Sequence, residues 1–371
     1  MSNTMCVLFS ESYTATPHEL AVERTLATVP FGGRYRLIDF VLSSLVAAGV
    51  DNVGVLTKEH YGSLLDHLGS GEDWDLARRN GGLTILTPFA KAETASTRNR
   101  SKIDALLSCR PYLEKTTEEY VILADTNVVM NIDFQAMVEY HIEKGADITL
   151  LYKNRSAAVN NGLVVDCGRN GQVIDAYYGN GQSRDTQSEL IKVFVFNKSL
   201  LLNLLDRAYT FGWEDFDRDF ITKNINKLNI YGFEHTGYCA VINTMADYYE
   251  ASLDLLKADI RHELFNSDIP ILTRVKNNAP ALHGFNGKVK NSLIADGCVI
   301  DGEVKNCIIF RGVKIEEGAV LEDCIIFQGG TIGAGAKLSC VITDKDVTVK
   351  EGQTLSGHPT YPFVIAKGQT V

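Results

Sequence analysis

"IIFRGVKIEEGAVLEDC", residues Ile308–Cys324, is the stretch that decides the architecture of the last third of the chain. Its apolar side chains recur every six residues, at Ile309, Ile315 and Leu321 and, after a slip of one residue, at Ile326, Ile332 and Leu338. Six-residue repeats predict a parallel β-helix, because each coil buries its apolar edge only when neighbouring coils stack on it. A small antiparallel β domain is the alternative. It would explain the alternation of apolar and polar residues but not the fixed period.

The first two thirds of the chain alternate short apolar runs with amphipathic stretches. Strands are predicted at Met5–Phe9, Asn52–Leu56, Leu83–Leu86, Tyr120–Ala124 and Asp147–Tyr152, and helices at Leu37–Ala48, Tyr61–Leu68, Ser101–Leu113 and Phe134–Lys144. This rhythm is typical of an α/β domain with a mostly parallel sheet, in which ligands bind outside the carboxyl ends of the strands. We therefore expect an α/β domain over residues 1–262, a linker over 263–285 and a β-helix over 286–371.

Composition argues against two classes of partner. A net charge of −10 argues against nucleic acid, whose phosphates attract clustered Lys and Arg side chains. No apolar run approaches the roughly 20 residues of a membrane span, and no basic stretch leads into an apolar one at the N-terminus. The eight cysteines form no CxxC pair, which favours reduced, buried thiols over disulfides or a zinc site. We expect a cytoplasmic protein that binds neither nucleic acid nor membrane.

Three motifs carry a resemblance to a known family. They are "VPFGGRYRLIDFVLSSLVAAGVDNVGVLT" (Val29–Thr57), "HLGSGEDWDL" (His67–Leu76) and "GGLTILTP" (Gly81–Pro88). They resemble the sugar-nucleotide pyrophosphorylases, and specifically bacterial glucose-1-phosphate adenylyltransferase, also called ADP-glucose pyrophosphorylase. The resemblance covers nearly the whole chain. It implies a Rossmann-like nucleotidyltransferase sheet domain followed by a C-terminal left-handed parallel β-helix.

The chemistry of that family needs four parts. A sugar phosphate attacks the α-phosphorus of ATP and expels pyrophosphate, so catalysis consists mainly of positioning and of neutralising charge on the phosphoryl oxygens. The parts are a glycine-rich loop around the triphosphate, basic residues that reach the phosphates, carboxylates that hold Mg²⁺ and an anchor for the sugar phosphate.

The two phosphate-binding parts are missing from this sequence. Where the family has L-A-G-G-x-G-x-R-L, the stretch Leu8–Ala15 contains neither glycine nor arginine and places Glu11 where the triphosphate would lie. Where the family has the lysine of A-K-P, this chain has Leu26. Side chains block the close backbone approach that glycine permits, and an isobutyl group makes no phosphate contact. The loop is then an ordinary strand-to-helix connection.

The metal-binding part is degenerate as well. By resemblance, Asn127 stands at the aspartate of the family's G-D-H, and Val241 stands at the aspartate of its W-R-D-V-G-T. Valine cannot ligate Mg²⁺. One alternative stays open, because Asp125 lies two residues before Asn127 and would share its strand face in a shifted register. We expect no metal and no cofactor in this chain, and Mg²⁺ only in a catalytic partner subunit.

The remaining substrate-binding motifs are altered too. The family's adenine-side G-T-A corresponds to Ser101, Lys102 and Ile103, and its sugar-side E-K-P falls near Tyr178–Asn180. Gly162 still matches a glycine beside the sugar. Because losses in separate segments coincide while the scaffold motifs persist, we expect a member of the adenylyltransferase family that is catalytically deficient alone.

The resemblance implies a regulatory or assembly subunit of glucose-1-phosphate adenylyltransferase in glycogen biosynthesis, bound to the catalytic subunit in a hetero-oligomer that we expect to be a tetramer. Two alternatives remain. One is a weakly active adenylyltransferase with a rearranged site that uses Asp125, and the other is a stand-alone metabolite sensor.

Two further hypotheses concern regulation and assembly. Arg34 and Arg36 follow the two glycines that lie near an anionic-effector site in the family, and together they could hold a phosphorylated metabolite. The alternative is a solvated loop or a pairing with Asp39. On the β-helix, an apolar row beside the inward positions predicts an outward face for a partner subunit, with packing against the chain's own sheet domain as the alternative. That row is Ile308, Phe310, Ile325 and Phe327.

Overall fold

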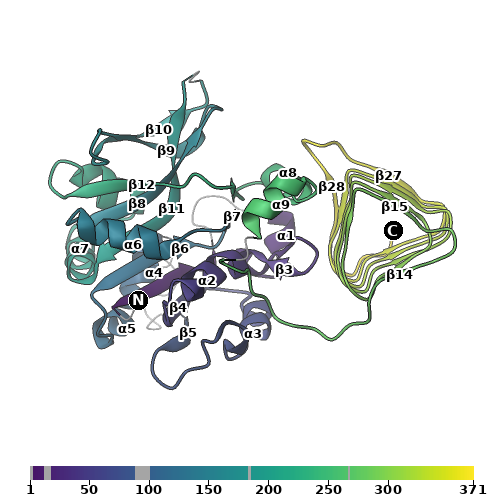
Figure 1. Cartoon of the computed structure of the whole chain (residues 1–371), viewed down its shortest axis with the longest axis horizontal. Coiled ribbons are helices and arrows are strands. Elements are labelled where there is room, and N and C mark those ends of the chain that lie inside the picture. The colour runs from purple at the N-terminus through teal and green to yellow at the C-terminus, as the bar shows by residue number, and fades with distance from the viewer. Residues whose placement is uncertain (1–2, 12–17, 88–100, 183–184, 266–267) are drawn as a thin grey trace.

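A computed structural model describes residues 3–11, 18–87, 101–182, 185–265 and 268–371 of the chain. A sheet domain with flanking helices is followed by a C-terminal β-helix of triangular cross-section (Figure 1). The two predicted architectures are therefore confirmed, in the predicted order.

The large sheet is mixed, with neighbours in the order β10-β9-β11-β6-β1-β4-β5, and β8 pairs with β11 while β12 pairs with β8. Its strands are β1 (Thr4–Phe9), β4 (Asn52–Leu56), β5 (Gly82–Leu86), β6 (Tyr120–Asp125), β8 (Ile148–Arg155), β9 (Asn160–Cys167), β10 (Val173–Asn180), β11 (Gln187–Asn197) and β12 (Ile230–Glu234). β6, β1, β4 and β5 run parallel, whereas β11 is antiparallel to β6, β8 and β9. The prediction of a mostly parallel sheet was thus wrong beyond β6, because the hairpin of β9 and β10 was not recognised in the sequence.

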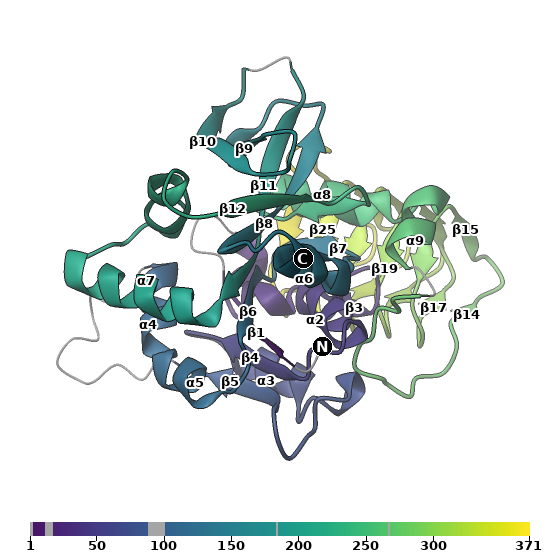
Figure 2. The same ribbon diagram turned by 60° about the vertical axis from the view of Figure 1, so that its left-hand side comes forward.

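Helices cover both faces of this sheet. The described helices are α1 (His18–Ala21), α2 (Leu37–Ala47), α3 (Gly62–Leu68), α4 (Lys102–Ser108), α5 (Arg110–Lys115), α6 (Phe134–Glu143), α7 (Lys198–Phe211), α8 (Met245–Asp254) and α9 (Ala258–Leu264). Of these, α4, α5 and α7 pack on one face of the sheet and α2 and α6 on the other (Figure 2), whereas α1, α8 and α9 lie toward the β-helix. Alternate residues of β1 point to opposite faces, so Val7 packs with α4, α5 and α7 while Leu8 packs with α2 and α6. The single helix predicted over Ser101–Leu113 is two helices that meet at Cys109.

Two small antiparallel pairs lie beside the sheet. β2 (Pro30–Phe31) pairs with β3 (Tyr35–Arg36), and β7 (Val128–Met130) pairs with β13 (Cys239–Val241). The pairing of β7 with β13 brings together two segments that are more than 100 residues apart in the sequence. This pairing places two of the predicted site positions next to each other.

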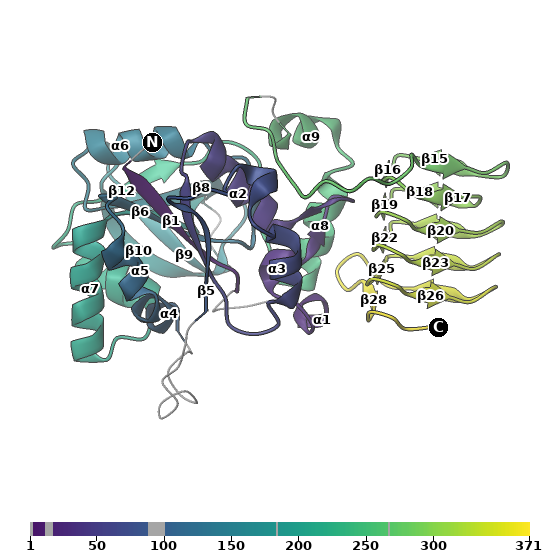
Figure 3. The ribbon, with the colours of Figure 1, turned by 90° about the horizontal axis from the view of Figure 1, so that it is seen from below.

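The β-helix has three parallel sheets of five strands each, and each coil contributes one strand to each sheet, so that the coils stack on one another (Figure 3). The first sheet is β14 (Leu282–His283), β17 (Val299–Ile300), β20 (Lys314–Ile315), β23 (Thr331–Ile332) and β26 (Thr348–Val349). The second is β15 (Lys288–Lys290), β18 (Glu303–Lys305), β21 (Val320–Glu322), β24 (Lys337–Ser339) and β27 (Thr354–Ser356). The third is β16 (Leu293–Ile294), β19 (Ile308–Ile309), β22 (Ile325–Ile326), β25 (Val341–Thr343) and β28 (Phe363–Ile365).

The third sheet of the β-helix packs against the sheet domain of the same chain. The apolar row Ile308, Phe310, Ile325 and Phe327 is buried in one core cluster with β2, α2 and α8. The ring centroids of Phe327 and Tyr248 on α8 are 6.3 Å apart, and Tyr249 Oη donates a hydrogen bond to Asp323 O. The prediction that this row faces a partner subunit was therefore wrong. The row fills the interface between the chain's own two domains.

Two sequence-level expectations can be compared with the described residues. All eight cysteines are free thiols, and seven of them are buried, as expected. Within the described ranges, no helix is long and apolar enough to cross a membrane.

Candidate functional site

Of the three positions that we predicted to be degenerate catalytic positions, Leu26, Asn127 and Val241, the structure brings Asn127 and Val241 together. Val241 on β13 pairs with Val128 on β7, directly after Asn127. Asn127 Nδ2 donates to Ile242 O (3.2 Å) and to Asn243 Oδ1 (3.0 Å). Leu26 is fully buried in the same core cluster as Ile242. The Asn127 and Val241 segments therefore meet in space, and Leu26 lies in the same core cluster as the residue that follows Val241.

The side chains at this place do not fit a magnesium ion. The Asn127 amide turns its nitrogen toward Ile242 and Asn243, and its buried Oδ1 has no hydrogen-bond partner among the described residues. One neutral oxygen beside the aliphatic Val241 is a poor site for a hard divalent cation, which prefers carboxylates. Across the described part of the chain, no group of three or more His, Cys, Asp or Glu side chains could hold a metal.

The end of β1 is closed against the Leu26 segment. Ala27 N donates to Ser10 O (3.0 Å), and the Leu26 N–H hydrogen-bonds to the Glu11 carboxyl. Burial raises the pKa of Glu11 to about 7, although this hydrogen bond and the nearby Lys58 oppose the rise. The rest of the loop, Ser12–Ala15, lies outside the described residues. At the described positions, the carboxyl group of Glu11 and the isobutyl group of Leu26 stand where the resemblance predicts a glycine and a lysine.

A buried ion pair occupies the carboxyl ends of β1 and β6. Lys102 Nζ lies 2.5 Å from Asp125 Oδ1, and the two side chains are 7% and 4% exposed. The ammonium also lies 4.6 Å from the ring centroid of Phe9 and 5.4 Å from that of Phe216. By resemblance, Lys102 stands at the adenine-side motif and Asp125 is the candidate replacement metal ligand. Because each group is the other's partner, Asp125 is not free to hold a metal.

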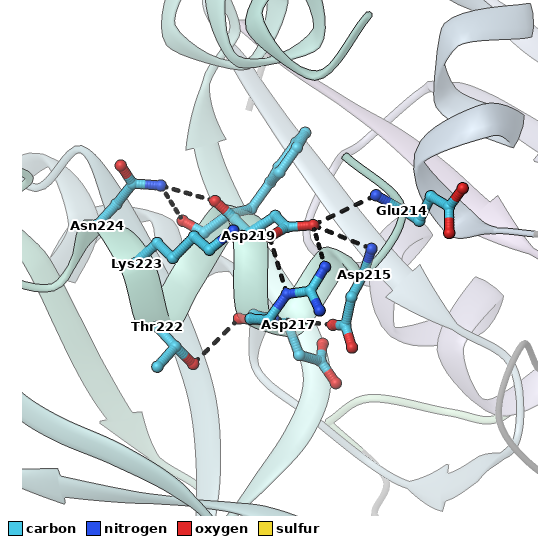
Figure 4. Close-up of polar contacts among 9 residues, drawn as sticks. Glu214, Asp215, Asp217, Asp219, Thr222, Lys223 and Asn224 are labelled. Carbon is cyan, nitrogen blue, oxygen red and sulfur yellow. Dashed lines mark hydrogen bonds and ion pairs between the residues drawn. The ribbon is translucent and has the colours of Figure 1, made fainter. Parts of the chain in front are cut away.

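A carboxylate cluster fixes the segment that carries Phe216 (Figure 4). The buried Asp219 carboxylate accepts hydrogen bonds from Glu214 N (3.2 Å), Asp215 N (3.1 Å) and Lys223 Nζ (2.7 Å), and both its oxygens accept from Arg218. Burial raises the pKa of Asp219, but the hydrogen bonds from Arg218 and Lys223 outweigh it and hold the pKa well below its usual value. These hydrogen bonds stabilise the backbone of residues 214–219, the segment to which Phe216 belongs.

A wide cleft of about 910 Å³ lies beside Val241 and includes Gly162. Its two basic residues are engaged by the protein: Lys153 donates to Gly237 O, and Arg155 Nε donates to Glu189 Oε2 (2.8 Å). Five acidic side chains line it, namely Glu189, Asp247, Glu250, Asp254 and Glu263. Five carboxylates against two engaged cations disfavour an anionic sugar phosphate.

A second cavity, of about 350 Å³, lies between the two domains and contains both arginines predicted for an effector. Arg34 is exposed, whereas Arg36 is half-buried and its Nη1 donates to Ser63 O (2.7 Å) and Oγ (2.8 Å). The pairing with Asp39 that we considered as an alternative exists only through the backbone, because Arg36 N donates to Asp39 Oδ2. The Asp39 carboxylate also contacts His67 Nε2 at 2.6 Å.

Four more basic residues line this cavity, which we call the anion pocket. They are Arg274 and Lys276 from the linker and Arg311 and Lys345 from the β-helix. Arg274 donates to Asp66 O, and Arg311 Nε donates to Asp296 Oδ1 (3.0 Å). Asp66 is the one carboxylate among the described residues that line the pocket. Six basic side chains therefore surround a space in which few negative charges offset them.

The basic groups of the anion pocket oppose one another's protonation. Burial lowers the pKa of Lys345 to about 8, with further lowering by Arg36 and Arg24, against which Asp344 acts. Burial likewise lowers the pKa of Arg36 to about 10, although Asp39 opposes this. The pKa of Lys276 is lowered by burial and then by Arg311 and Arg36. An anion in this pocket would relieve the repulsion among these cations.

Our sequence analysis missed four of the six basic residues of the pocket, although a signal was present. Asp296, Arg311, Gln328 and Lys345 occupy equivalent places in successive coils, 15 and then twice 17 residues apart, each just before a corner of the β-helix. A polar column next to a corner was therefore readable from the repeat. Lys102 was noticed only as a mismatch, because nothing local in the sequence indicates that Asp125 faces it.

The sequence pattern of the nucleotidyl transferase family matches residues 19–257, which is more than half of the chain. The chain belongs to that family. Residues 278–360 match the GlmU-like C-terminal hexapeptide family, in agreement with the β-helix.

Relatives place the chain more narrowly. It is 34% identical over 363 residues to the glycogen biosynthesis protein GlgD of Bacillus subtilis (strain 168), covering 98% of this chain and 95% of the relative. It is 36% identical to GlgD of Geobacillus stearothermophilus, covering 99% and 97%. Identity to the glucose-1-phosphate adenylyltransferase of Mycoplasma mobile is 30%, over 80% of this chain and 78% of that enzyme. The chain is thus a divergent member of the adenylyltransferase family, as the sequence motifs predicted.

Proposed function

We propose that this chain is a regulatory or assembly subunit of glucose-1-phosphate adenylyltransferase in glycogen biosynthesis and has no useful catalysis of its own. The observation that carries the proposal is the Lys102–Asp125 pair at the strand ends, within a family fold that is otherwise preserved. Leu26, Asn127 and Val241 add the loss of a phosphate contact and of both metal carboxylates. The names of the two GlgD relatives support the pathway.

The alternative of a weakly active enzyme loses its main support. It required Asp125 as a replacement metal ligand, and that carboxylate is bound by Lys102 inside the fold. A stand-alone metabolite sensor is the second candidate, since the residues of this chain alone line the anion pocket. Association with a catalytic homologue separates the sensor from the proposed subunit.

The anion pocket supplies the regulatory part of the proposal. It joins the sheet domain to the β-helix, with Arg34 and Arg36 on one side and Arg311 and Lys345 on the other. Beside it, Arg24 of the sheet domain donates two hydrogen bonds to Asp344 of the β-helix, at 2.8 and 2.7 Å. A phosphorylated metabolite bound there would bridge the same two domains.

The open end of the β-helix is the surface that we propose for assembly. β14, β15 and β16 form the first coil and pair on one side only within the described chain. Phe285 is fully exposed there, and Leu282 is 61% exposed. A strand edge with exposed apolar side chains is a template for another chain. This surface replaces the buried apolar row of β19 and β22 in our hypothesis.

Co-expression with a catalytic glucose-1-phosphate adenylyltransferase tests the proposal. We expect a hetero-oligomer by light scattering, and a turnover or effector response that differs from that of the catalytic subunit alone. Leu282→Asp with Phe285→Asp should abolish the complex, whereas Phe211→Asp, at a 66% exposed residue on α7, should not. Point variants are needed, because deleting the β-helix would uncover the apolar surface of α8. A wild-type chain that stays apart from the catalytic subunit would refute the proposal.

A further inference from the structure

An aromatic patch lies at the end of α7, on the side of the sheet domain that is opposite to the β-helix (Figure 1, Figure 3). The helix buries an apolar stripe that consists of Leu201, Leu204, Leu205 and Ala208. Phe211 follows Ala208 at helical spacing and continues this stripe, yet its side chain is 66% exposed. The stripe therefore extends past the part of the helix that the sheet domain covers.

The end of α7 holds two aromatic rings together. Gly212 ends the helix with a left-handed φ of 64°, and Trp213 N donates a hydrogen bond to Ala208 O (3.0 Å), so the chain folds back at this point. The ring centroids of Phe211 and Trp213 are 6.2 Å apart, and the ring planes differ by 25°. The half-buried Trp213 also packs edge-on against the buried Phe220, at 6.0 Å between centroids. Trp213 is thus anchored in the core, and it orients the exposed ring of Phe211.

The charged side chains around the aromatic patch offset one another. The Arg207 guanidinium lies 5.8 Å from the centroid of the indole ring, and the exposed Glu214 comes directly after the indole in the chain. Next to Arg207, Asp206 forms a salt bridge with Arg110 of α5, which also pairs with Glu114. These side chains leave no excess of positive charge. The patch is therefore a poor site for nucleic acid or an anionic membrane, and a neutral ligand fits it better.

The size of the aromatic patch argues against a protein partner. Each partner in a stable protein interface buries about 800 Å², whereas one aromatic side chain buries about 150–250 Å². Tyr209 lies in the same turn and is 72% exposed, but even three such side chains fall short of that area. A pyranose ring, in contrast, is about as large as one aromatic ring. Its C–H groups form apolar faces that can stack on Phe211, and its hydroxyl groups lie around the rim.

We infer that the aromatic patch of Phe211 and Trp213 binds an α-glucan chain, with one pyranose face stacked on the Phe211 ring. The guanidinium N–H groups of Arg207 can donate to sugar hydroxyls, and the Glu214 carboxylate can accept from them. The choice of an α-glucan rests on the proposed role in glycogen biosynthesis. One stacked ring binds a sugar weakly, but several copies of the patch in the proposed hetero-oligomer can bind one polymer together and far more tightly.

Electrophoresis of the isolated full chain through native gels that contain glycogen tests the inference. We expect glycogen to retard the wild type relative to a gel without polysaccharide, and maltoheptaose to relieve this retardation by competition. Phe211→Tyr keeps the flat ring and should bind as the wild type does. Phe211→Leu keeps an apolar side chain without the ring and should bind about tenfold more weakly. Tyr361→Leu is the matched control, because it removes an aromatic ring that is 79% exposed on the β-helix, and it should bind like the wild type.

The outcomes distinguish a glucan from other occupants of the patch. If glycogen does not retard the wild type, or if Phe211→Leu binds as tightly as Phe211→Tyr, the patch does not bind a glucan by stacking and the inference is wrong. Equal weakening by Tyr361→Leu would also contradict it. If light scattering shows that the wild type self-associates and that Phe211→Leu does not, the patch is instead an interface between copies of this chain. The proposed subunit role is tested separately by co-expression, so it can stand or fail independently of these results.

Discussion

The carboxyl ends of β1 and β6, where Lys102 and Asp125 lie, and the anion pocket between the domains both contain charged side chains, but these charges are arranged differently. At the strand ends, Lys102 has its own buried carboxylate 2.5 Å away and needs no ligand. In the anion pocket, six basic side chains face Asp66, the one carboxylate among the described lining residues, and only Arg311 of the six has a carboxylate partner, Asp296, in a salt bridge. A site whose charges are balanced from within disfavours a charged ligand, whereas a site with excess positive charge attracts an anion.

This difference shows which constraint acts on each region. Buried ion pairs contribute little net stability, but removal of one partner leaves an uncompensated charge that is very costly. The Lys102–Asp125 pair therefore behaves as part of the core. Cations that repel one another lower the stability of the free protein, and such a cluster persists where an anion or a functional demand offsets the repulsion.

The largest effect that we expect from this comparison is on catalysis. With ATP, glucose 1-phosphate and Mg²⁺, the isolated chain should turn over at least about 1,000-fold more slowly than the typical enzyme rate of about 10 per second, because the phosphate and metal contacts are absent. Restoring the carboxylates with Asn127→Asp and Val241→Asp should not rescue it, since Glu11 and Leu26 still stand where the resemblance places a glycine and the phosphate-binding lysine. If a pyrophosphate-release assay of the wild-type chain gave a turnover near that of ordinary enzymes, the conclusion that the degenerate site cannot catalyse the reaction would be wrong.

Much of the fold was predictable from the sequence, and the reason is periodicity. The six-residue repeat gave the β-helix, and the bounds of β4 were predicted at Asn52–Leu56, as the structure has them. The antiparallel strands β9 to β11 were missed. Strands that are buried on both faces, or that lie at a polar edge of a sheet, do not alternate regularly between apolar and polar residues. The helix break at Cys109 was missed because the apolar positions of α4 and α5 continue across it.

The candidate sites were predictable only where one segment carries the signal. Arg34 and Arg36 belong to one motif, and the structure places both in the anion pocket. Lys345 and Arg274 reach the same pocket from the β-helix and the linker, so their meeting depends on how the two domains pack. The prediction that the row with Ile308 and Phe327 faces a partner subunit was wrong for the same reason. The sequence shows that a face is apolar, but it does not show which surface covers that face.

The next effect tests the strand-end ion pair by stability. Lys102→Met keeps a similar volume but leaves Asp125 buried without its partner, so we expect a loss of about 3–5 kcal/mol in the free energy of unfolding. The double substitution Lys102→Met with Asp125→Leu should recover most of this loss. Urea denaturation measures both. As a control, Lys367→Met breaks an exposed pair with Glu23 and should cost less than about 1 kcal/mol. Equal losses in the single and double variants would mean that the pair is not a self-contained unit.

The smallest effect tests the anion pocket through Lys345. Substitution of Lys345 should stabilise the protein, whereas substitution of Lys102 should destabilise it. The pKa of Lys345 is about 8 in the folded protein, below its ordinary value of 10.5, through burial and then the nearby Arg36 and Arg24. Between these values the unfolded chain binds more protons than the folded one, so stability rises with pH across this window. Below pH 8 the cost of the buried charge is fully present.

Lys345→Met should therefore be more stable than the wild type by about 1 kcal/mol at pH 7, after allowance for screening by solvent, and this advantage should shrink as the pH rises from 8 toward 10. Inorganic phosphate should stabilise the wild type more at pH 7 than at pH 9.5, because a neutral Lys345 offers the anion less charge, and the variant should lose most of that pH dependence. Urea denaturation at several pH values, with and without phosphate, measures both trends, and Lys350→Met, at an exposed lysine of the β-helix, serves as the matched control. If the free energy of unfolding changed with pH in the same way for the wild type and for Lys345→Met, Lys345 would not be part of a cluster of mutually repelling cations. The contrast between the two regions would then depend on the arginines alone.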